Sequence, residues 1–380
     1  MRIGINALYL IPGGVGGTET YLRALLAEFA EIDRENLYFV FTNRETGADL
    51  VPKRDNFIHE PQPIRAEFRP GRLLWEQTAL PLAAARLRLD VMLNPGFTAP
   101  ILCGCPQVTV FHDLQHKRHP ENFRRLDLPA WEFFLFWSAH VSRILLADSA
   151  ATAADLHRFY RLPESAVRVV PLAVSDDFRA IAARRRPEPF LLAVSTLHPH
   201  KNLDGLLRAF AGFRKRRPEF RLTVTGIHGF FTEELRTLRD SLGLADSVDF
   251  PGWIPIDELH ALYARAWAFL YPSKFEGFGL PVLEAMAAGV PTACSSIEPL
   301  AGIAADAALQ FDPYSPEAIA AAMERIVADD SLRARLAEAG PRRAAQFTWR
   351  ATAESTLNYV AQAILPAAPA LLPGRSKDPK

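Results

Sequence analysis

The sequence predicts an α/β protein with two facing, doubly wound domains and a cleft between them. Three observations carry this prediction. The chain has 380 residues, more than a single hydrophobic core usually supports. Short apolar strands alternate with helical patterns in both halves, which is typical of parallel sheets covered by helices. The charged, proline-rich segment 173–189 interrupts this alternation between the halves.

The N-terminal half starts with the expected strand "RIGINAL", a glycine loop and the helical pattern "TETYLRALLAEFAEI". Further strands are expected in "LYFVFT", "LDVMLNP", "QVTVFHD" and "ILLADSA". We therefore expect an N-terminal Rossmann-like domain over residues 1–175. A linker over 176–188 follows it.

The C-terminal half repeats the pattern, with strands expected in "FLLAVSTL", "RLTVTGI", "SVDFPG" and "AFLYPS". It predicts a second Rossmann-like domain over 189–346. Residues 347–364 are expected to form a helix that packs against a domain, with packing back on the N-terminal domain as one option. The tail 365–380, rich in proline and small residues, is expected to be disordered.

Charge and cysteine content narrow the functional classes. The chain has 43 Lys and Arg residues and 43 Asp and Glu residues, so its formal net charge is zero. No overall electrostatic field therefore attracts nucleic acid. Three cysteines, Cys103, Cys105 and Cys294, cannot make a disulfide framework, which indicates a reduced, cytoplasmic setting. No uncharged apolar run of about 18 residues suggests a membrane span.

Two sequence features allow a second interpretation, a peripheral contact with the inner face of the membrane. The aromatic stretch 128–147 is interpreted as a partly buried helix, with an acceptor-facing or membrane-touching surface as the alternative. The basic runs 179–187 and 214–218 are interpreted as solvated charge, with docking to anionic lipid as the alternative.

The stretch "KFEGFGLPVLEAMAAGVP", residues 274–291, carries the strongest site signal. Ligands of open α/β sheets bind beyond the carboxyl ends of strands, and "AFLYPS" ends directly before Glu276. A short helix is expected at 280–288, and its N-terminal N–H groups offer a seat for phosphate. One acid, Glu284, would then serve a ribose and Glu276 a transferred sugar. The alternative is that Glu284 only favours the helix start and Glu276 is solvated.

The stretch "EGFGLPVLEAMAAG" resembles the E-x7-E signature of retaining glycosyltransferases of family 4, which have the GT-B fold. Further resemblance lies in "PGGVGGTETYLRALL", "VTVFHDL", "STLHPHKNLDGLLRAF" and "AADAALQFDPYSPEAIAAAMERI", and extends over roughly residues 1–362. The family's usual arginine before the lysine is replaced by His200. The glutamate of its common "LPEVAG" is missing from "LAGIAA", residues 300–305.

The resemblance implies a role for each matching residue. Three residues would be catalytic: Glu276 at the donor sugar and reacting centre, Lys201 at the diphosphate, and His112 over the sugar near the acceptor. Donor binding would add Glu284 at the ribose and the backbone of six other residues: Gly16, Gly17, Gly277, Phe278, Gly279 and Leu280. Taken alone, Lys201 could be an exposed helix-start lysine, and His112 could form a structural pair with Asp113.

The predicted function is retaining transfer of a hexose, such as mannose, glucose or rhamnose, from a nucleoside-diphosphate sugar. The acceptor would be a glycan or lipid-linked sugar in bacterial polysaccharide or glycolipid synthesis. No cofactor and no metal are expected, because the chain lacks an Asp-x-Asp pair. Two alternatives remain: a catalytically silent sugar-nucleotide-binding module, disfavoured by the intact Glu276, Lys201 and His112, and a nicotinamide-dependent dehydrogenase. The dehydrogenase is disfavoured because "GGVGG" lacks the G-x-G-x-x-G register.

Overall fold

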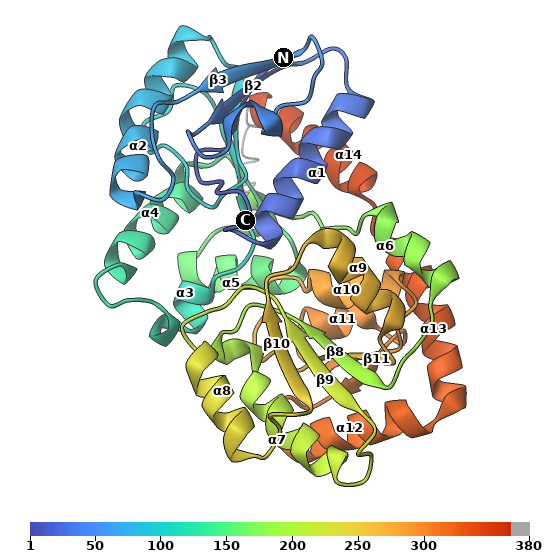
Figure 1. Cartoon of the computed structure of the whole chain (residues 1–380). Helices are drawn as coiled ribbons and strands as arrows, with labels where there is room; N and C mark the ends of the chain where they lie inside the picture. Colours follow the sequence, from blue (N-terminus) through green and yellow to red (C-terminus); the bar gives the residue numbers. More distant parts are fainter. Residues whose placement is uncertain (366–380) are drawn as a thin grey trace, which may run out of the picture.

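The structure, a computed structural model, describes residues 1–365. Two Rossmann-like α/β domains lie one above the other in Figure 1, each with a parallel sheet between helices. The predicted α/β fold class is confirmed. Except for Leu365, the tail that was predicted to be disordered lies outside the described residues.

The N-terminal sheet has seven parallel strands in the order β3-β2-β1-β4-β5-β6-β7. Its strands are β1 (Arg2–Asn6), β2 (Leu37–Thr42), β3 (Phe57–Pro61), β4 (Val91–Asn94), β5 (Gln107–Phe111), β6 (Ile144–Ala147) and β7 (Val167–Val169). Its helices are α1 (Gly17–Ile32), α2 (Arg69–Arg86), α3 (Gln115–Arg118), α4 (Leu128–Val141) and α5 (Ala150–Tyr160). Strand β1 lies centrally, with Ile3 paired to Tyr38 on one side and to Val91 on the other.

The C-terminal sheet has six parallel strands in the order β10-β9-β8-β11-β12-β13. Its strands are β8 (Phe190–Val194), β9 (Arg221–Thr225), β10 (Val248–Gly252), β11 (Ala268–Tyr271), β12 (Thr292–Ser295) and β13 (Leu309–Phe311). Its helices are α7 (Leu203–Arg214), α8 (Thr232–Ser241), α9 (Ile256–Arg265), α10 (Leu280–Ala287), α11 (Leu300–Ala304), α12 (Pro316–Ala328) and α13 (Asp330–Ala344).

In both sheets the strand order reverses beside the first strand of the domain. The reversal lies between β1 and β4 in the N-terminal sheet and between β8 and β11 in the C-terminal sheet. Crevices at such switch points, outside the carboxyl ends of the strands, are where open α/β sheets bind ligands. The topology therefore marks one expected ligand position on each domain.

Two segments outside the sheets connect the domains. Helix α6 (Asp176–Ile181) and a 3₁₀ turn (Ala182–Arg184) occupy the segment predicted as a linker, and Phe178 and Ile181 are buried there. Helix α14 (Trp349–Ile364) returns to the N-terminal domain and lies beside α1 (Figure 1). The Thr352 hydroxyl on α14 donates a 2.8 Å hydrogen bond to the Pro171 carbonyl.

Most strand residues are buried on both faces, as expected for parallel sheets sandwiched by helices. Helix α4 differs, since Leu135, Ser138 and Ala139 are buried while Phe133 and Trp137 are exposed. Within residues 1–365, no helix has the length and apolar character needed to cross a membrane.

Candidate active site

The centre of the candidate site is an ion pair between Lys201 and Glu276. Lys201 ends a 3₁₀ turn (Pro199–Lys201) after β8, and Glu276 lies in the loop after β11, so both flank the switch point of the C-terminal sheet. The Lys201 Nζ atom lies 2.7 Å from Glu276 Oε1 and 3.2 Å from the Tyr271 hydroxyl. Both side chains are largely shielded, with 13% and 10% exposed. The two predicted residues thus meet, and each compensates the other's charge.

The Gly277 backbone joins this loop to the N-terminal domain. Its carbonyl accepts hydrogen bonds from the Ser149 hydroxyl at 2.6 Å and the Thr152 hydroxyl at 3.2 Å. A Cβ atom at position 277 would lie 1.8 Å from the His112 carbonyl oxygen, so no side chain fits there. Sequence reasoning missed Ser149 and Thr152. The only signal in the sequence was the position of Ser149 between a strand and a helix, which predicts a helix N-cap and not a contact between the domains.

His112 follows β5 and is held at both ring nitrogens. Its Nδ1 lies 2.7 Å from Asp148 Oδ2, and its Nε2 lies 2.9 Å from the Pro95 carbonyl oxygen. Both partners are acceptors, so this geometry favours a ring that carries a proton on each nitrogen. Burial lowers the pKa of His112, but the Asp148 charge and hydrogen bond outweigh it and raise the pKa overall.

This arrangement bears on the role expected for His112. Its structural partner is Asp148, whereas Asp113 accepts a 2.9 Å bond from the Gln115 backbone N–H instead. Neither ring nitrogen points free to a substrate, so a ring contact with the donor sugar would require one of these bonds to be replaced. Asp148 was not singled out from the sequence, because it lies 36 positions away.

Glu284 lies in α10, and its Oε2 accepts a 3.1 Å hydrogen bond from the Tyr263 hydroxyl. Burial raises the pKa of Glu284 to about 7, only partly offset by this hydrogen bond. The carboxyl group is therefore poised between its neutral and ionised forms near physiological pH. Hydroxyl groups that donate to it would favour the ionised form.

The N-terminus of α10 lies where loops of both domains meet. Gly279 precedes the helix with φ 122°, and a Cβ there would lie 2.3 Å from the Leu300 side chain. From the N-terminal domain, Gly16 has φ 58°, and a Cβ on Gly17 would lie 3.4 Å from Leu280. The Phe278 side chain is buried against Phe347, so only its backbone faces the loop. The predicted glycine loop and helix start are thus brought together, and the start of α10 leaves N–H groups for an anion.

His200, which replaces the arginine of the family pattern, is not a second cation. It is buried, and its Nδ1 accepts a 2.9 Å hydrogen bond from the Gln115 amide. Burial and the nearby Lys201 charge lower the pKa of His200 to about 2. The ring is therefore neutral, and Lys201 carries the positive charge at this end of β8.

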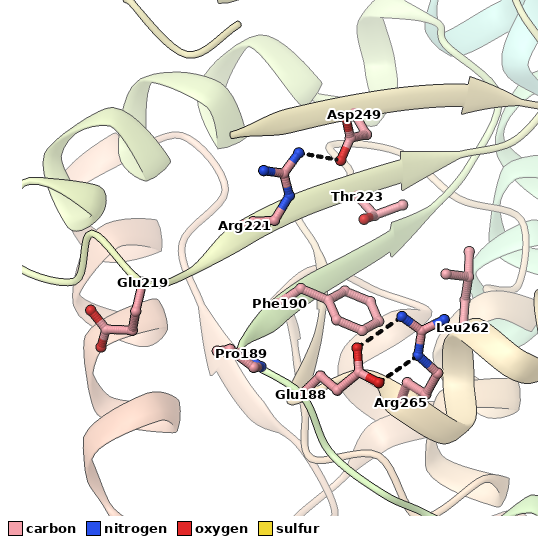
Figure 2. A pocket seen from close by; sticks show the side chains of 9 residues that line it. All are labelled: Glu188, Pro189, Phe190, Glu219, Arg221, Thr223, Asp249, Leu262 and Arg265. Atoms are coloured by element: carbon pink, nitrogen blue, oxygen red, sulfur yellow. Dashed lines mark hydrogen bonds and ion pairs between the residues drawn. The ribbon is translucent and has the colours of Figure 1, made fainter. Parts of the chain in front are cut away.

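A separate hollow of about 260 Å³ lies at the amino ends of β8, β9 and β10, away from this site (Figure 2). Four of its five charged side chains form ion pairs, Glu188 with Arg265 at 2.8 Å and Arg221 with Asp249 at 3.0 Å, while Glu219 lines its edge. Parallel sheets bind ligands at the opposite edge. We therefore interpret the hollow as a surface depression and not as a ligand site.

Comparison with known proteins identifies the family. Residues 15–178 match the profile described as Glycosyltransferase Family 4, and residues 174–343 match Glycosyl transferases group 1. The chain belongs to glycosyltransferase family 4, with the GT-B fold. It is therefore a glycosyltransferase, as its sequence motifs predict.

The relatives include several enzymes named as mannosyltransferases. The chain is 31% identical to the O-antigen chain mannosyltransferase B of Escherichia coli, over 66% of this chain and 69% of that protein. It is 34% identical to a D-inositol 3-phosphate glycosyltransferase of Salinispora arenicola, over 93% of this chain and 88% of that protein. It spans only 42% of the serotype-specific mannosyltransferase WbdA of Escherichia coli, at 28% identity over 82% of this chain.

Solved structures support the same architecture. Sucrose-phosphate synthase from Thermosynechococcus elongatus superposes with a TM-score of 0.76 at 21% identity, covering 95% of this chain and 98% of that one. Anabaena HepE in complex with UDP-glucose superposes with a TM-score of 0.72 at 17% identity, covering 95% and 100%. At sequence identities of 21% and 17%, these superpositions show a common fold only.

Proposed function

We propose that the protein transfers a mannosyl group, with retention of configuration, from a nucleoside-diphosphate sugar to a glycan or lipid-linked acceptor in bacterial polysaccharide or glycolipid synthesis. The observation that carries this proposal is the Lys201–Glu276 pair at the switch point, beside the start of α10. Mannose is favoured among the hexoses because several relatives, O-antigen chain mannosyltransferase B among them, are named as mannosyltransferases.

Lys201 and Glu276 divide the work on the donor. A diphosphate seated at the start of α10 would draw the Lys201 ammonium away from Glu276 and pair with it. The freed Glu276 carboxylate could then accept hydrogen bonds from hydroxyl groups of the sugar. Negative charge grows on the diphosphate as the glycosidic bond breaks, so a fixed ammonium and fixed N–H dipoles stabilise the transition state more than the ground state.

Glu284 supports the nucleotide part of the donor in this proposal. Ribose hydroxyls would donate to its carboxylate and replace water around a group whose pKa is raised to about 7. Donor binding and ionisation of Glu284 would therefore strengthen each other.

We propose that catalysis needs no metal, since Lys201 and the α10 N-terminus supply the charge that a metal would otherwise provide. No group of three or more His, Cys, Asp or Glu in residues 1–365 is arranged to hold a metal ion. Full activity in excess EDTA is the expected result. Loss of activity that Mg²⁺ or Mn²⁺ restores would contradict the proposal.

A donor screen tests the function. The protein would be incubated with GDP-mannose, UDP-glucose, ADP-glucose and dTDP-rhamnose, and both thermal stabilisation and released nucleoside diphosphate would be measured. We expect stabilisation and turnover with GDP-mannose or another mannosyl donor. A ligand at a hundred times its Kd stabilises by about 2.7 kcal/mol. Stabilisation without turnover would indicate a silent binding module. No response to any donor would overturn the proposal.

The exposed face of α4 is proposed to contact the membrane that holds a lipid-linked acceptor. Phe133, Phe136 and Trp137 are 51%, 41% and 40% exposed, and Arg124 and Arg125 precede the helix on the surface. Aromatic side chains beside arginines are typical of surfaces that insert shallowly among anionic head groups. Co-sedimentation with phosphatidylglycerol vesicles should fall for Phe133→Ser and Trp137→Ser. Unchanged binding would remove α4 from the contact.

A further inference from the structure

Two cysteines lie side by side in the loop that joins β4 to β5. The Sγ atoms of Cys103 and Cys105 are 3.5 Å apart, and only Gly104 separates the two residues in the chain. Both side chains are partly exposed and lie at the edge of a hydrophobic cluster in the N-terminal domain. The third cysteine, Cys294, is fully buried in β12. Solvent can therefore reach the pair, whereas the third thiol is closed to it.

The loop allows the two sulfur atoms to move closer. A disulfide bond is about 2.05 Å long, so the sulfur atoms would have to approach each other by about 1.5 Å. Gly104 is exposed, and a Cβ atom on it would have no other atom within 4 Å. Within the described chain, no backbone-to-backbone hydrogen bond involves residues 102–105. This part of the backbone can therefore shift without breaking such a bond.

The two thiols differ in acidity. The hydrogen bond from the Cys105 thiol outweighs burial and lowers the pKa of Cys103 to about 7, with further hydrogen bonds from the N–H groups of Gly104 and Cys105. The same contact and burial raise the pKa of Cys105. A thiolate is the attacking species in disulfide exchange, and a thiol attacks best when its pKa is near the ambient pH. Cys103 is therefore the better nucleophile of the two.

We propose that Cys103 and Cys105 are a redox-active dithiol that exchanges with a low-molecular-weight disulfide such as oxidised glutathione. The Cys103 thiolate attacks one sulfur of that disulfide, which forms a mixed disulfide and releases one thiolate. Cys105 then attacks the Cys103 sulfur and releases the second thiolate, which takes up the proton that Cys105 loses. Two protein thiols are thus oxidised to an intramolecular disulfide, and one small disulfide is reduced to two thiols.

The dithiol shares its loop with groups that support the candidate site. The Pro95 carbonyl accepts the hydrogen bond from His112 Nε2, and the Gln77 amide bonds to the backbone of Ala99 and Ile101. The first half of the loop is thus fixed, while the half that carries the cysteines is exposed and less restrained. Exposed disulfides are typically the labile ones, so the proposed bond is a reversible modification. The proposal goes beyond glycosyl transfer and does not depend on it.

Thiol trapping on the full chain tests this proposal. The reduced protein would be equilibrated at neutral pH with graded ratios of oxidised to reduced glutathione, trapped with N-ethylmaleimide and digested with trypsin. One tryptic peptide, residues 89–117, contains both cysteines, and its mass distinguishes the dithiol, the mixed disulfide and the intramolecular disulfide. The same titration in urea measures disulfide formation without the fold. Cys294 is the internal control, and Cys103→Ser and Cys105→Ser separate the two thiols.

We expect the wild type to form the intramolecular disulfide reversibly, while Cys294 stays reduced. The equilibrium constant should be about threefold or more higher in the folded protein than in urea, because the fold holds the two sulfur atoms in contact. Cys105→Ser should form its mixed disulfide at Cys103 about threefold or more faster than Cys103→Ser does at Cys105.

Three results would overturn the proposal. They are a wild type that stays a dithiol at the highest ratio of oxidised glutathione, an equal equilibrium constant in the folded protein and in urea, and equal rates at the two cysteines. The first two come from the wild type alone, so they decide the proposal even if a variant fails to fold. Thermal unfolding of both variants shows whether the third comparison concerns folded protein.

Discussion

Replacing Lys201 by alanine tests the electrostatic mechanism most sharply. The change removes the ammonium that lies 2.7 Å from Glu276 and leaves a carboxylate with only 10% of its surface exposed. In the ligand-free protein, loss of one partner from a fully buried pair costs about 3–5 kcal/mol. We expect a loss of about 2–3 kcal/mol here, because residual exposure of both side chains lets water screen the stranded charge.

The effect on turnover should be larger than the effect on donor affinity. Removing one fixed group that stabilises the developing charge of the transition state typically lowers kcat about 10²–10³-fold. In Lys201→Ala the carboxylate of Glu276 also remains beside the diphosphate without compensation, which places the expected loss at the upper end of that range. Both kcat and kcat/KM should therefore fall.

Steady-state kinetics with the donor that the screen selects provides the assay. Lys201→Arg should recover part of the rate, and Lys215→Ala, which removes an exposed lysine at the end of α7, should change nothing. Adding Glu276→Gln to Lys201→Ala should restore stability but not rate, since Glu276 has its own contact with the sugar. If Lys201→Ala changes only KM, Lys201 binds ground and transition state equally and the electrostatic assignment fails.

Further predictions concern three residues around this centre. Donor affinity should rise as pH increases through about 7, where Glu284 ionises, and Glu284→Gln should abolish this dependence in calorimetry and cost about 1.5–3 kcal/mol. The raised pKa also means that the free energy of unfolding of the ligand-free protein falls as the pH rises from 4.5, the ordinary pKa of a glutamate, to about 7, which urea titrations can check. Gly277→Ala should lower activity at least tenfold with a small change in Tm, because a Cβ would lie 1.8 Å from the His112 carbonyl oxygen; full activity would show that this contact is dispensable. Asp148→Asn should destabilise the fold by about 3 kcal/mol in urea titrations, since it leaves a buried imidazolium unpaired, and an unchanged midpoint would show that His112 is neutral.

The fold was predictable because its pattern is local. Parallel strands buried on both faces read as short apolar runs, and the helices between them carry their own periodicity. The exception is the segment predicted as a linker. Its charge and prolines obscured the buried pair Phe178 and Ile181, whose spacing of three residues is the mark of the short helix α6.

Much of the candidate site could be predicted because short sequence motifs carry it, those of Lys201 and His112 included. Glu276, Gly277 and Glu284 lie in a single stretch that couples a strand end to a helix start. Asp148 was missed because nothing in its local sequence sets it apart from an ordinary strand end. Its importance comes from a tertiary neighbour far along the chain, His112, which lies 36 positions away.

A proton NMR time course of the transfer reaction tests both the retention of configuration and the role of Lys201. The wild type would be mixed with the selected nucleoside-diphosphate sugar and its acceptor, and the anomeric signal of the first product would be followed beside that of the donor. We predict a product with the donor's anomeric configuration, formed by the wild type and almost absent with Lys201→Ala. A first product of inverted configuration, or equal rates for the two proteins, would contradict the account.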